Sequence, residues 1–331
     1  MSTTIEPGLV TVVVASYNHA RYLKRRMDSL LAQTYRQLEI LVIDDRSPDN
    51  SVEILRTYEA DPRVKLIVRE QNGGWVAVSN QGAELARGEF LLFGNCDDAC
   101  DPRLVERLVD AMHKHPSAGI AFSRSVFTDE NDRVIGDDFA TRERDFRRLC
   151  QHDVLIPAAR MSRFLLDSCA IPNLSAALFR NRCFADVGML SPNYRVCSDW
   201  DLYFRIAASY DVAYVAEPLN QFRQHEATIR SVTKERVIND ETLSLLLREI
   251  RALDLSFLER CKYRTHAMYI WALHIISPSW SGLRNFPYLA RRVFTLDPPS
   301  LLFLLPGLAK RAIGVMGKVL SRLHLIPDTP R

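Results

Sequence analysis

The sequence predicts an α/β protein with a mostly parallel sheet, helices on both faces of that sheet, and a C-terminal helical extension. In the first half of the chain, short apolar runs rich in β-branched residues alternate with segments of helical periodicity. These runs are apolar throughout rather than alternating, which is typical of parallel strands that are covered on both faces. Beyond residue 232 the pattern is helical only.

Each expected element follows from its local pattern. Strands are expected over the apolar runs, and helices over segments whose apolar residues recur every three or four positions. A serine and a proline at positions 47 and 48 are a typical helix start. In chain order, the expected strands are 9–15, 38–43, 64–68, 89–93, 120–127, 175–179 and 212–215, and the expected helices are 20–33, 47–58, 75–86 and 198–209.

The composition is that of an ordinary soluble globular protein. With 47% hydrophobic and 25% charged residues, it excludes disordered, collagen-like and disulfide-rich classes. A net charge of +3 is too small to indicate nucleic-acid binding by the whole surface. Seven scattered cysteines indicate reduced thiols, and the N-terminus has no secretory signal pattern. We therefore expect a cytoplasmic protein that binds no nucleic acid.

The chain is expected to divide near residues 230–235. An α/β domain would span residues 1–232, with halves at about 8–100 and 101–232, and residues 233–331 would form a helical region. The stretch 265–283 has no Lys, Arg, Asp or Glu, but it contains two histidines and Pro278. We expect a buried helix ending near Pro278 rather than a membrane span.

Polar and acidic residues follow three expected strands at their carboxyl ends. These are residues 15–18 after the first strand, Asp44 and Asp45 after the second, and Asp97 and Asp98 after the fourth. The carboxyl ends of parallel strands share one edge of the sheet, and ligands bind there in such folds. Four carboxylates at short range favour a divalent cation, Mg²⁺ or Mn²⁺, that would bridge a diphosphate.

Phosphate-binding glycine loops are not evident in the sequence. Neither a P-loop nor GxGxxG follows the first expected strand, which argues against a kinase or a dehydrogenase. Asn72, Gly73 and Gly74 are either a simple turn or a place where backbone N–H groups meet an anion. Asp97 and Asp101 have a second interpretation as caps of the next helix.

Four segments of the chain occur together in a characteristic order. They are VTVVVASYNHARYLKRRMDSLLAQTY, LEILVIDDRSPDNS, NGGWVAVSNQGAELARGEFLLFGNCDD and SDWDLYFRIA, which begin at residues 10, 38, 72 and 198. Over about residues 8–230, this set resembles the family 2 glycosyltransferases. The resemblance implies the Rossmann-like GT-A fold, with a nucleotide-binding half at about 8–100 and an acceptor half at 101–232. It also implies inverting transfer of a sugar from a nucleotide-diphosphate donor to a saccharide.

The resemblance implies donor-binding roles at the strand ends and in the adjoining turn. The ring of Tyr17 would stack on the base, and Asp45 would accept a hydrogen bond from a ring N–H of the base. Asp97 would contact the ribose or a metal-bound water. From residue type alone, Tyr17 has a second interpretation as a core aromatic. The implied donor-binding residues are Ala15, Ser16, Tyr17, Asn18, Asp45, Asn72 and Asp97.

The resemblance also implies a metal site and a catalytic base. Asp98 and His225 would hold Mg²⁺ or Mn²⁺, which would stabilise the departing nucleoside diphosphate. Asp199 would take the proton from the acceptor hydroxyl, although an aspartate at this position is also a typical helix cap. Arg223 would offset phosphate charge, and Trp200 would either face the acceptor sugar or close the core.

The C-terminal segment is basic and amphipathic. Between residues 283 and 331, eight Lys and Arg stand against two Asp and Glu. On a helix at residues 300–324 the basic and apolar side chains fall on different sides, which suits an anionic membrane surface, and packing on the catalytic domain is the alternative. Because similar tails in the family accompany lipid-linked acceptors, we expect a peripheral enzyme at the inner face of the cytoplasmic membrane.

Two other functions compete with this one. A sugar-phosphate nucleotidyltransferase is disfavoured, since the chain has no glycine- and lysine-rich N-terminal loop. A non-catalytic module that binds nucleotide sugars is disfavoured by the presence of both Asp98 and Asp199. The expected function is therefore transfer from a UDP- or dTDP-sugar in polysaccharide or cell-envelope biosynthesis.

Overall fold

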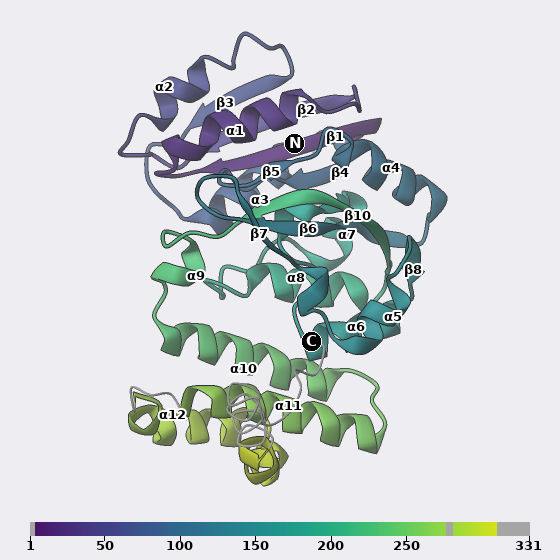
Figure 1. Cartoon of the computed structure of the whole chain (residues 1–331), viewed down its shortest axis with the longest axis vertical. Helices are drawn as coiled ribbons and strands as arrows, with labels where there is room; N and C mark the ends of the chain where they lie inside the picture. The colour runs from purple at the N-terminus through teal and green to yellow at the C-terminus, as the bar shows by residue number, and fades with distance from the viewer. Residues whose placement is uncertain (1–3, 276–280, 310–331) are drawn as a thin grey trace. The chain divides into compact units, whose positions relative to one another are not determined.

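The computed structural model describes residues 4–275 and 281–309 (Figure 1). The chain divides into two compact units. The first comprises Met1–Asn193 and Ser198–Thr228, and the second comprises Tyr194–Cys197 and Ile229–Arg331. The chain therefore crosses between the two units three times.

The first unit is built on one sheet. Its strands are β1 Glu6–Ser16, β2 Leu38–Asp44, β3 Val64–Val68, β4 Gly88–Phe93, β5 Ala99–Cys100, β6 Ala118–Thr128, β7 Val134–Asp137, β8 Val154–Ile156, β9 Ala177–Arg180 and β10 Asp211–Arg223. Along the sheet the order is β3-β2-β1-β4-β9-β6-β10-β5, with β7 beside β6 and β8 beside β10. Strands β3, β2, β1 and β4 are parallel, and β9 runs antiparallel to both β4 and β6.

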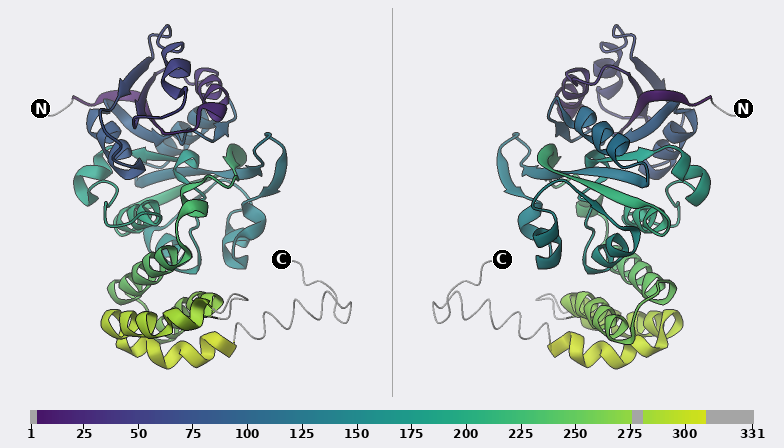
Figure 2. Two further views of the ribbon diagram at one scale, coloured as in Figure 1. Left: turned by 90° about the vertical axis from the view of Figure 1, so that its left-hand side faces the viewer. Right: turned by 90° about the vertical axis from the view of Figure 1, so that its right-hand side faces the viewer.

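Helices cover both faces of this sheet (Figure 2). They are α1 Ala20–Leu31, α2 Ser51–Arg56, α3 Trp75–Leu85, α4 Leu104–Lys114, α5 Arg144–Leu149, α6 Ala158–Asp167, α7 Arg182–Val187 and α8 Ser198–Ala207, with 3-10 turns at Phe139–Thr141 and Leu174–Ala176. On one face, Leu23 of α1 packs in the core cluster that contains Val12 of β1. On the other face, a Cβ added to Gly82 of α3 would lie 2.2 Å from Val13. The expected fold class is confirmed.

Most expected elements are confirmed, with three differences in their bounds. The strand expected at 212–215 is part of the longer β10, Asp211–Arg223. The helix expected at 47–58 is limited to Ser51–Arg56. The strand expected at 175–179 begins as a 3-10 turn, because the side chain of Asn173 accepts the N–H of Ala176 and holds the chain in that turn. Strands β7 and β8 and helices α5, α6 and α7 are additions that the sequence pattern did not indicate.

The second unit is helical. It contains α9 Ile229–Val232, α10 Glu235–Ala252, α11 Phe257–Ile275, α12 Ser281–Leu296 and the 3-10 helix η3 Pro298–Phe303. Glu241 of α10 accepts the N–H groups of Arg195, Val196 and Cys197, and these bonds tie the segment Tyr194–Cys197 to this unit. Within the described ranges, no helix combines the length and the apolar character needed to cross a bilayer. The expected helix end near residue 278 and most of the expected tail, residues 310–324, lie outside the described residues.

Candidate functional site

The first strand ends in a turn that exposes an aromatic ring. Asn18 adopts a φ of 53°, and its N–H donates to Ser47 Oγ at 3.0 Å. Ser16 Oγ donates to Asp44 Oδ2 at 2.9 Å, which joins the end of β1 to the end of β2. Tyr17, between them, has 43% of its surface exposed. The interpretation of Tyr17 as a core aromatic is therefore wrong, and its ring can meet a ligand.

Asp45 is buried just after β2 and holds the turn before α3. Its carboxylate accepts hydrogen bonds from Arg69 Nη1 at 2.6 Å and from the N–H groups of Gly73 and Gly74 at 3.0 and 2.7 Å. Gly74 has a φ of 83°, which favours glycine. The N–H groups of this turn do meet an anion, but the anion is a side chain of the protein. Asn72 lies exposed in the same turn.

Asp98 is fully buried, and both of its oxygens accept hydrogen bonds. Oδ1 accepts the backbone N–H of Arg223 at 3.0 Å, and Oδ2 accepts Asn173 Nδ2 at 2.7 Å and Asn95 Nδ2 at 3.3 Å. Burial and the neighbouring charge of Asp97 raise the pKa of Asp98 to about 7. The structure thus differs from the expectation that Asp98 is a metal ligand, because this carboxylate points into the protein.

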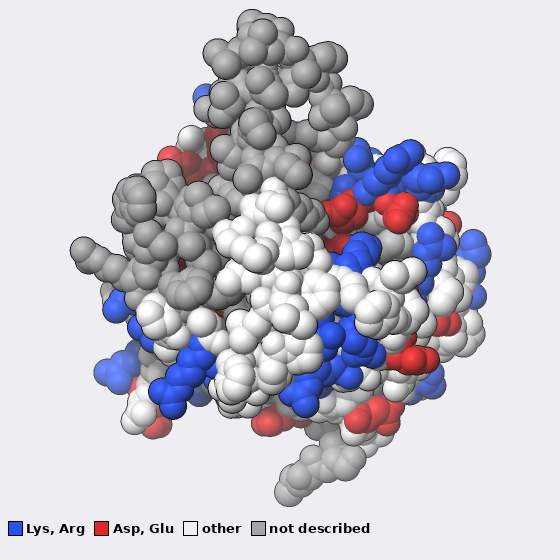
Figure 3. Space-filling model, turned by 90° about the horizontal axis from the view of Figure 1, so that it is seen from below, with Lys and Arg blue, Asp and Glu red and all other residues white. Residues whose placement is uncertain are grey.

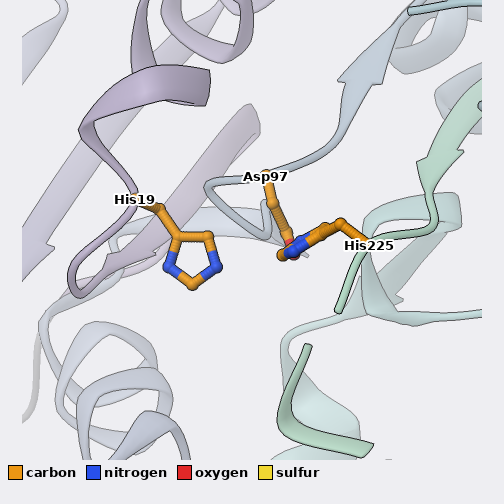
Figure 4. Close-up of side chains that lie close together, drawn as sticks. All are labelled: His19, Asp97 and His225. Carbon is orange, nitrogen blue, oxygen red and sulfur yellow. The ribbon is translucent and has the colours of Figure 1, made fainter. Parts of the chain in front are cut away.

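Asp97 points instead toward two histidines (Figure 4). Its Oδ2 lies 3.0 Å from His225 Nε2, and the ring centroids of His225 and His19 are 5.4 Å apart. One donor atom from each of the three residues lies within 4.8 Å of the other two. Burial alone would raise the pKa of Asp97, but the hydrogen bond to His225 and the favourable electrostatic environment beside His19 hold it below its ordinary value.

The donor set of this cluster fits a divalent metal ion. Two imidazole nitrogens and a carboxylate oxygen are common ligands of first-row transition metals. His19 is not among the residues expected from the sequence, although it follows Tyr17 by two positions. The position of His19 in the chain could have identified it. The residue belongs to the segment after the first strand, and that segment was expected at the edge of the sheet.

Arg223 is buried beneath the cluster and serves the protein rather than a ligand. Its Nε donates to the carbonyl oxygen of Asp97 at 2.7 Å, and its Nη1 to that of Asp129 at 2.8 Å. Its Nη2 bonds to Asp132 Oδ1, and the guanidinium lies 4.6 Å from the ring centroid of Tyr22. The side chain ties the Asp97 loop to the hairpin between β6 and β7, which replaces the phosphate contact expected for it.

Helix α8 carries Asp199 in its first turn. Asp199 is partly buried, and its Oδ1 accepts the N–H of Trp200 at 2.7 Å. Burial is the main cause that raises the pKa of the Tyr203 hydroxyl, and the charge of Asp199, one helical turn earlier on α8, adds to it. Trp200 is 7% exposed, and its indole N–H donates to the carbonyl oxygen of Leu165. Of the two interpretations of Trp200, the structure supports the core aromatic.

Known proteins match the part of the chain that contains Tyr17, His19 and Asp97. Residues 11–169 match the model of the family described as Glycosyl transferase family 2. The match covers just under half of the chain. GlyG, a glycosyltransferase of Streptococcus pneumoniae serotype 4, is 33% identical over 141 residues, which are 41% of this chain and 46% of GlyG. An uncharacterized glycosyltransferase of Nostoc sp. is 33% identical over 128 residues, 38% of this chain and 39% of that relative. The match therefore spans less than half the length of these relatives.

Solved structures share the fold of the family 2 domain. S. aureus TarS 1-349 in complex with UDP-GlcNAc superposes with a TM-score of 0.67 at 17% identity, over 92% of this chain and 88% of TarS. The mannosyltransferase PcManGT from Pyrobaculum calidifontis, in complex with GDP-Man and Mn²⁺, gives a TM-score of 0.50 at 16% identity, over 92% and 86%. At these identities the likeness concerns the fold alone, and it confirms the expected GT-A fold.

Proposed function

We propose that this chain is an inverting glycosyltransferase that moves a sugar from a UDP- or dTDP-sugar to a saccharide acceptor. The observation that carries the proposal is the set of residues that lie together at one edge of the sheet. There the exposed ring of Tyr17 and the cluster of His19, Asp97 and His225 follow the ends of β1, β4 and β10. An aromatic face for a base and a cation site for a diphosphate are the two parts that a nucleotide-sugar site needs. The UDP-GlcNAc and GDP-Man complexes of structures with this fold support the same class of donor.

The donor base is placed beside Tyr17 in this proposal. Asp45 already accepts bonds from Arg69 and from two glycine N–H groups, so we assign it to fixing the turn rather than to binding the base. The exposed Asn72 then lies on a rigid turn at the border of the site. The remaining residues that we assign to the donor pocket are Ala15, Ser16 and Asn18.

The diphosphate is placed beside Asp97 and His225, which would hold Mg²⁺ or Mn²⁺. Such an ion supplies positive charge that stabilises the departing nucleoside diphosphate. In this proposal Asp98 does not bind the ion itself, but positions Asp97. Its bonds to Asn173 and to the N–H of Arg223 fix the loop between β4 and β5, and they keep Asp97 directed at His225.

Asp199 is the proposed base. Its carboxylate would take the proton of the acceptor hydroxyl while that oxygen bonds to the anomeric carbon and the bond to the diphosphate breaks. Attack from the side opposite the leaving group inverts this carbon.

We further propose that the acceptor, a saccharide that includes lipid-linked forms, is met at the inner face of the cytoplasmic membrane. In the helical unit Phe257, Leu258, Leu302 and Leu305 are each more than three-quarters exposed. Figure 3 shows uncharged residues across the middle of one face, with Lys and Arg, and also Asp and Glu, around them. Exposed apolar side chains beside basic ones suit an anionic membrane surface. Polysaccharide or cell-envelope assembly would use such an enzyme.

A panel of donors tests the proposed substrate class. Thermal unfolding of the protein with Mn²⁺ and UDP-, GDP- or dTDP-sugars is expected to show the largest rise in Tm with the true donor, since a ligand of the folded state stabilises it. Release of nucleoside diphosphate from that donor is expected with Mn²⁺ and is lost on adding EDTA. Binding without any release would instead identify a non-catalytic module.

The variant Asp199→Asn tests the base. We expect a loss of about 10²- to 10⁴-fold in turnover, because the amide cannot accept the proton, while the thermal shift caused by the donor stays as in the unchanged protein. The matched control is Asp186→Asn, which alters an exposed aspartate of α7 and should leave turnover unchanged. Near-normal turnover of Asp199→Asn would end the assignment.

A further inference from the structure

We propose that His19 is a third protein ligand of the metal ion, and that the site therefore selects Mn²⁺ over Mg²⁺. This inference rests on the proposed function in one respect, namely that a divalent ion binds between Asp97 and His225. It adds a residue and a metal preference that the family match does not assign.

The imidazole of His19 is prepared as a ligand by its own hydrogen bond. Its Nδ1 lies 2.5 Å from the carbonyl oxygen of Tyr17. A carbonyl oxygen only accepts, so Nδ1 carries the proton, and in the neutral ring Nε2 keeps its lone pair. Metal-bound histidines characteristically donate their second ring N–H to such a group, which fixes both the tautomer and the orientation of the ring.

The Nε2 atom of His19 is also buried without a partner. It has no hydrogen-bond partner among residues 4–275 and 281–309, although it is shielded from solvent. A buried nitrogen lone pair that meets no donor costs free energy, and a bound cation would remove that cost. In Figure 4 the edge of the His19 ring faces Asp97 and His225, so the lone pair is directed into the cluster.

The distances within the cluster suit one shared ion. The three donor atoms lie within 4.8 Å of one another. Ligands that stand about 2.1–2.2 Å from one ion are at most about 4.4 Å apart, so a small rotation of the His19 ring completes the shell. The ring of Tyr22 packs beside both histidines, at 6.0 Å from His19 and 5.1 Å from His225 between centroids, and holds them on the same side.

The composition of the shell decides the preferred metal. Mg²⁺ favours oxygen ligands and retains its waters, and it is usually bound by one or two carboxylates together with phosphate. Two neutral imidazoles and one carboxylate suit Mn²⁺ and its neighbours in the first transition row better than Mg²⁺. With three ligands from the protein, the ion can bind before any diphosphate is present. The site should therefore take up Mn²⁺ before the donor arrives.

Electron paramagnetic resonance of Mn²⁺ with the full-length protein, in the absence of nucleotide, tests this inference. The signal of free Mn²⁺ should fall as it binds, and an excess of Mg²⁺ should not restore it. His19→Gln is expected to weaken Mn²⁺ binding by at least about tenfold. His152→Gln, at an exposed histidine away from the cluster, should bind Mn²⁺ as the unchanged protein does. Thermal unfolding in EDTA should be equal for both variants, which separates ligation from folding.

Four results would overturn the inference. If Asp97→Asn loses Mn²⁺ but His19→Gln binds it normally, His19 is not a ligand. If the unchanged protein binds no Mn²⁺ without nucleotide, or releases it to Mg²⁺, the three-ligand site does not exist. If His19→Gln unfolds early in EDTA, the histidine serves the fold. Release of nucleoside diphosphate from the donor is measured separately, so failure of the transferase proposal is distinguished from each of these.

Discussion

The four aspartates at the sheet edge differ in the groups that balance their charge. Asp44 accepts serine hydroxyls, Asp45 accepts Arg69 and two glycine N–H groups, and Asp98 accepts Asn173 and the N–H of Arg223. Asp97 faces histidines instead. Burying a carboxylate is costly unless donors surround it. The cation that we propose for this edge of the sheet therefore belongs beside Asp97 rather than among all four carboxylates.

The sequence located these carboxylates but could not choose between the neighbours at 97 and 98. Both residues lie in the turn between β4 and β5, where the N–H of Asp98 donates to the carbonyl oxygen of Asn95. In this turn Asp98 faces the protein and Asp97 faces the histidines. The donors that claim Asp98 come from about 75 and 125 positions further along the chain. No local pattern reveals such partners. For the same reason, Trp200 could not be assigned to the core before its contact with Leu165 was known.

Arg223→Ala should destabilise the fold. The change removes the donors to the carbonyl oxygens of Asp97 and Asp129, and leaving a buried acceptor without a donor costs about 1–3 kcal/mol. We expect the free energy of unfolding in urea to fall by about 2–4 kcal/mol. Arg21→Ala is the matched control, because Arg21 reaches Glu130 in the same hairpin, but through an exposed ion pair of 3.2 Å. An exposed pair contributes at most about 1 kcal/mol. If both variants lost the same free energy of unfolding, Arg223 would not be the residue that ties the Asp97 loop to the hairpin.

At the scale of the elements, periodicity succeeded where strands are long and uniformly apolar. It failed in the second half of the unit for two physical reasons. Strands β7 and β8 have four and three residues, too few for a period to show. Strand β10 continues through Pro218, where its register with β6 shifts, so the apolar pattern breaks although the strand goes on.

The packing of α3 on β1 depends on the absence of a side chain at Gly82. A Cβ there would lie 2.2 Å from Val13 Cγ1, and overpacking of this kind costs about 1–3 kcal/mol. Gly82→Ala is therefore expected to lower the free energy of unfolding in urea by that amount. The double variant with Val13→Ala should lose less than the sum of the two single changes, because the clash is gone. If the losses in free energy of unfolding were additive, α3 would have moved away from β1 in the Gly82→Ala variant instead of clashing with Val13.

At the scale of the whole molecule, the proposed membrane contact depends on apolar side chains that solvent reaches. Leu302 and Leu305 are 80% and 76% exposed. Replacing both with serine should reduce the fraction of protein that sediments with phosphatidylglycerol-containing vesicles. Each leucine that is buried in the membrane contributes about 1.5–3 kcal/mol to the free energy of binding. The control pair Val134→Ser and Ile135→Ser removes exposed apolar residues, at 65% and 59%, from β7 in the other unit. Equal effects of the two pairs, or none, would refute a specific role for the helical unit.

The short segment Tyr194–Cys197 limits how this protein can be divided. It belongs to the helical unit, where Glu241 holds three of its N–H groups, yet the next residues open α8 with Asp199. Cutting the chain after Thr228 would remove Glu241 and leave those N–H groups without their acceptor. The two units are therefore not interchangeable modules on a single linker. Exchange of helical units between relatives would have to carry this four-residue segment along with α10.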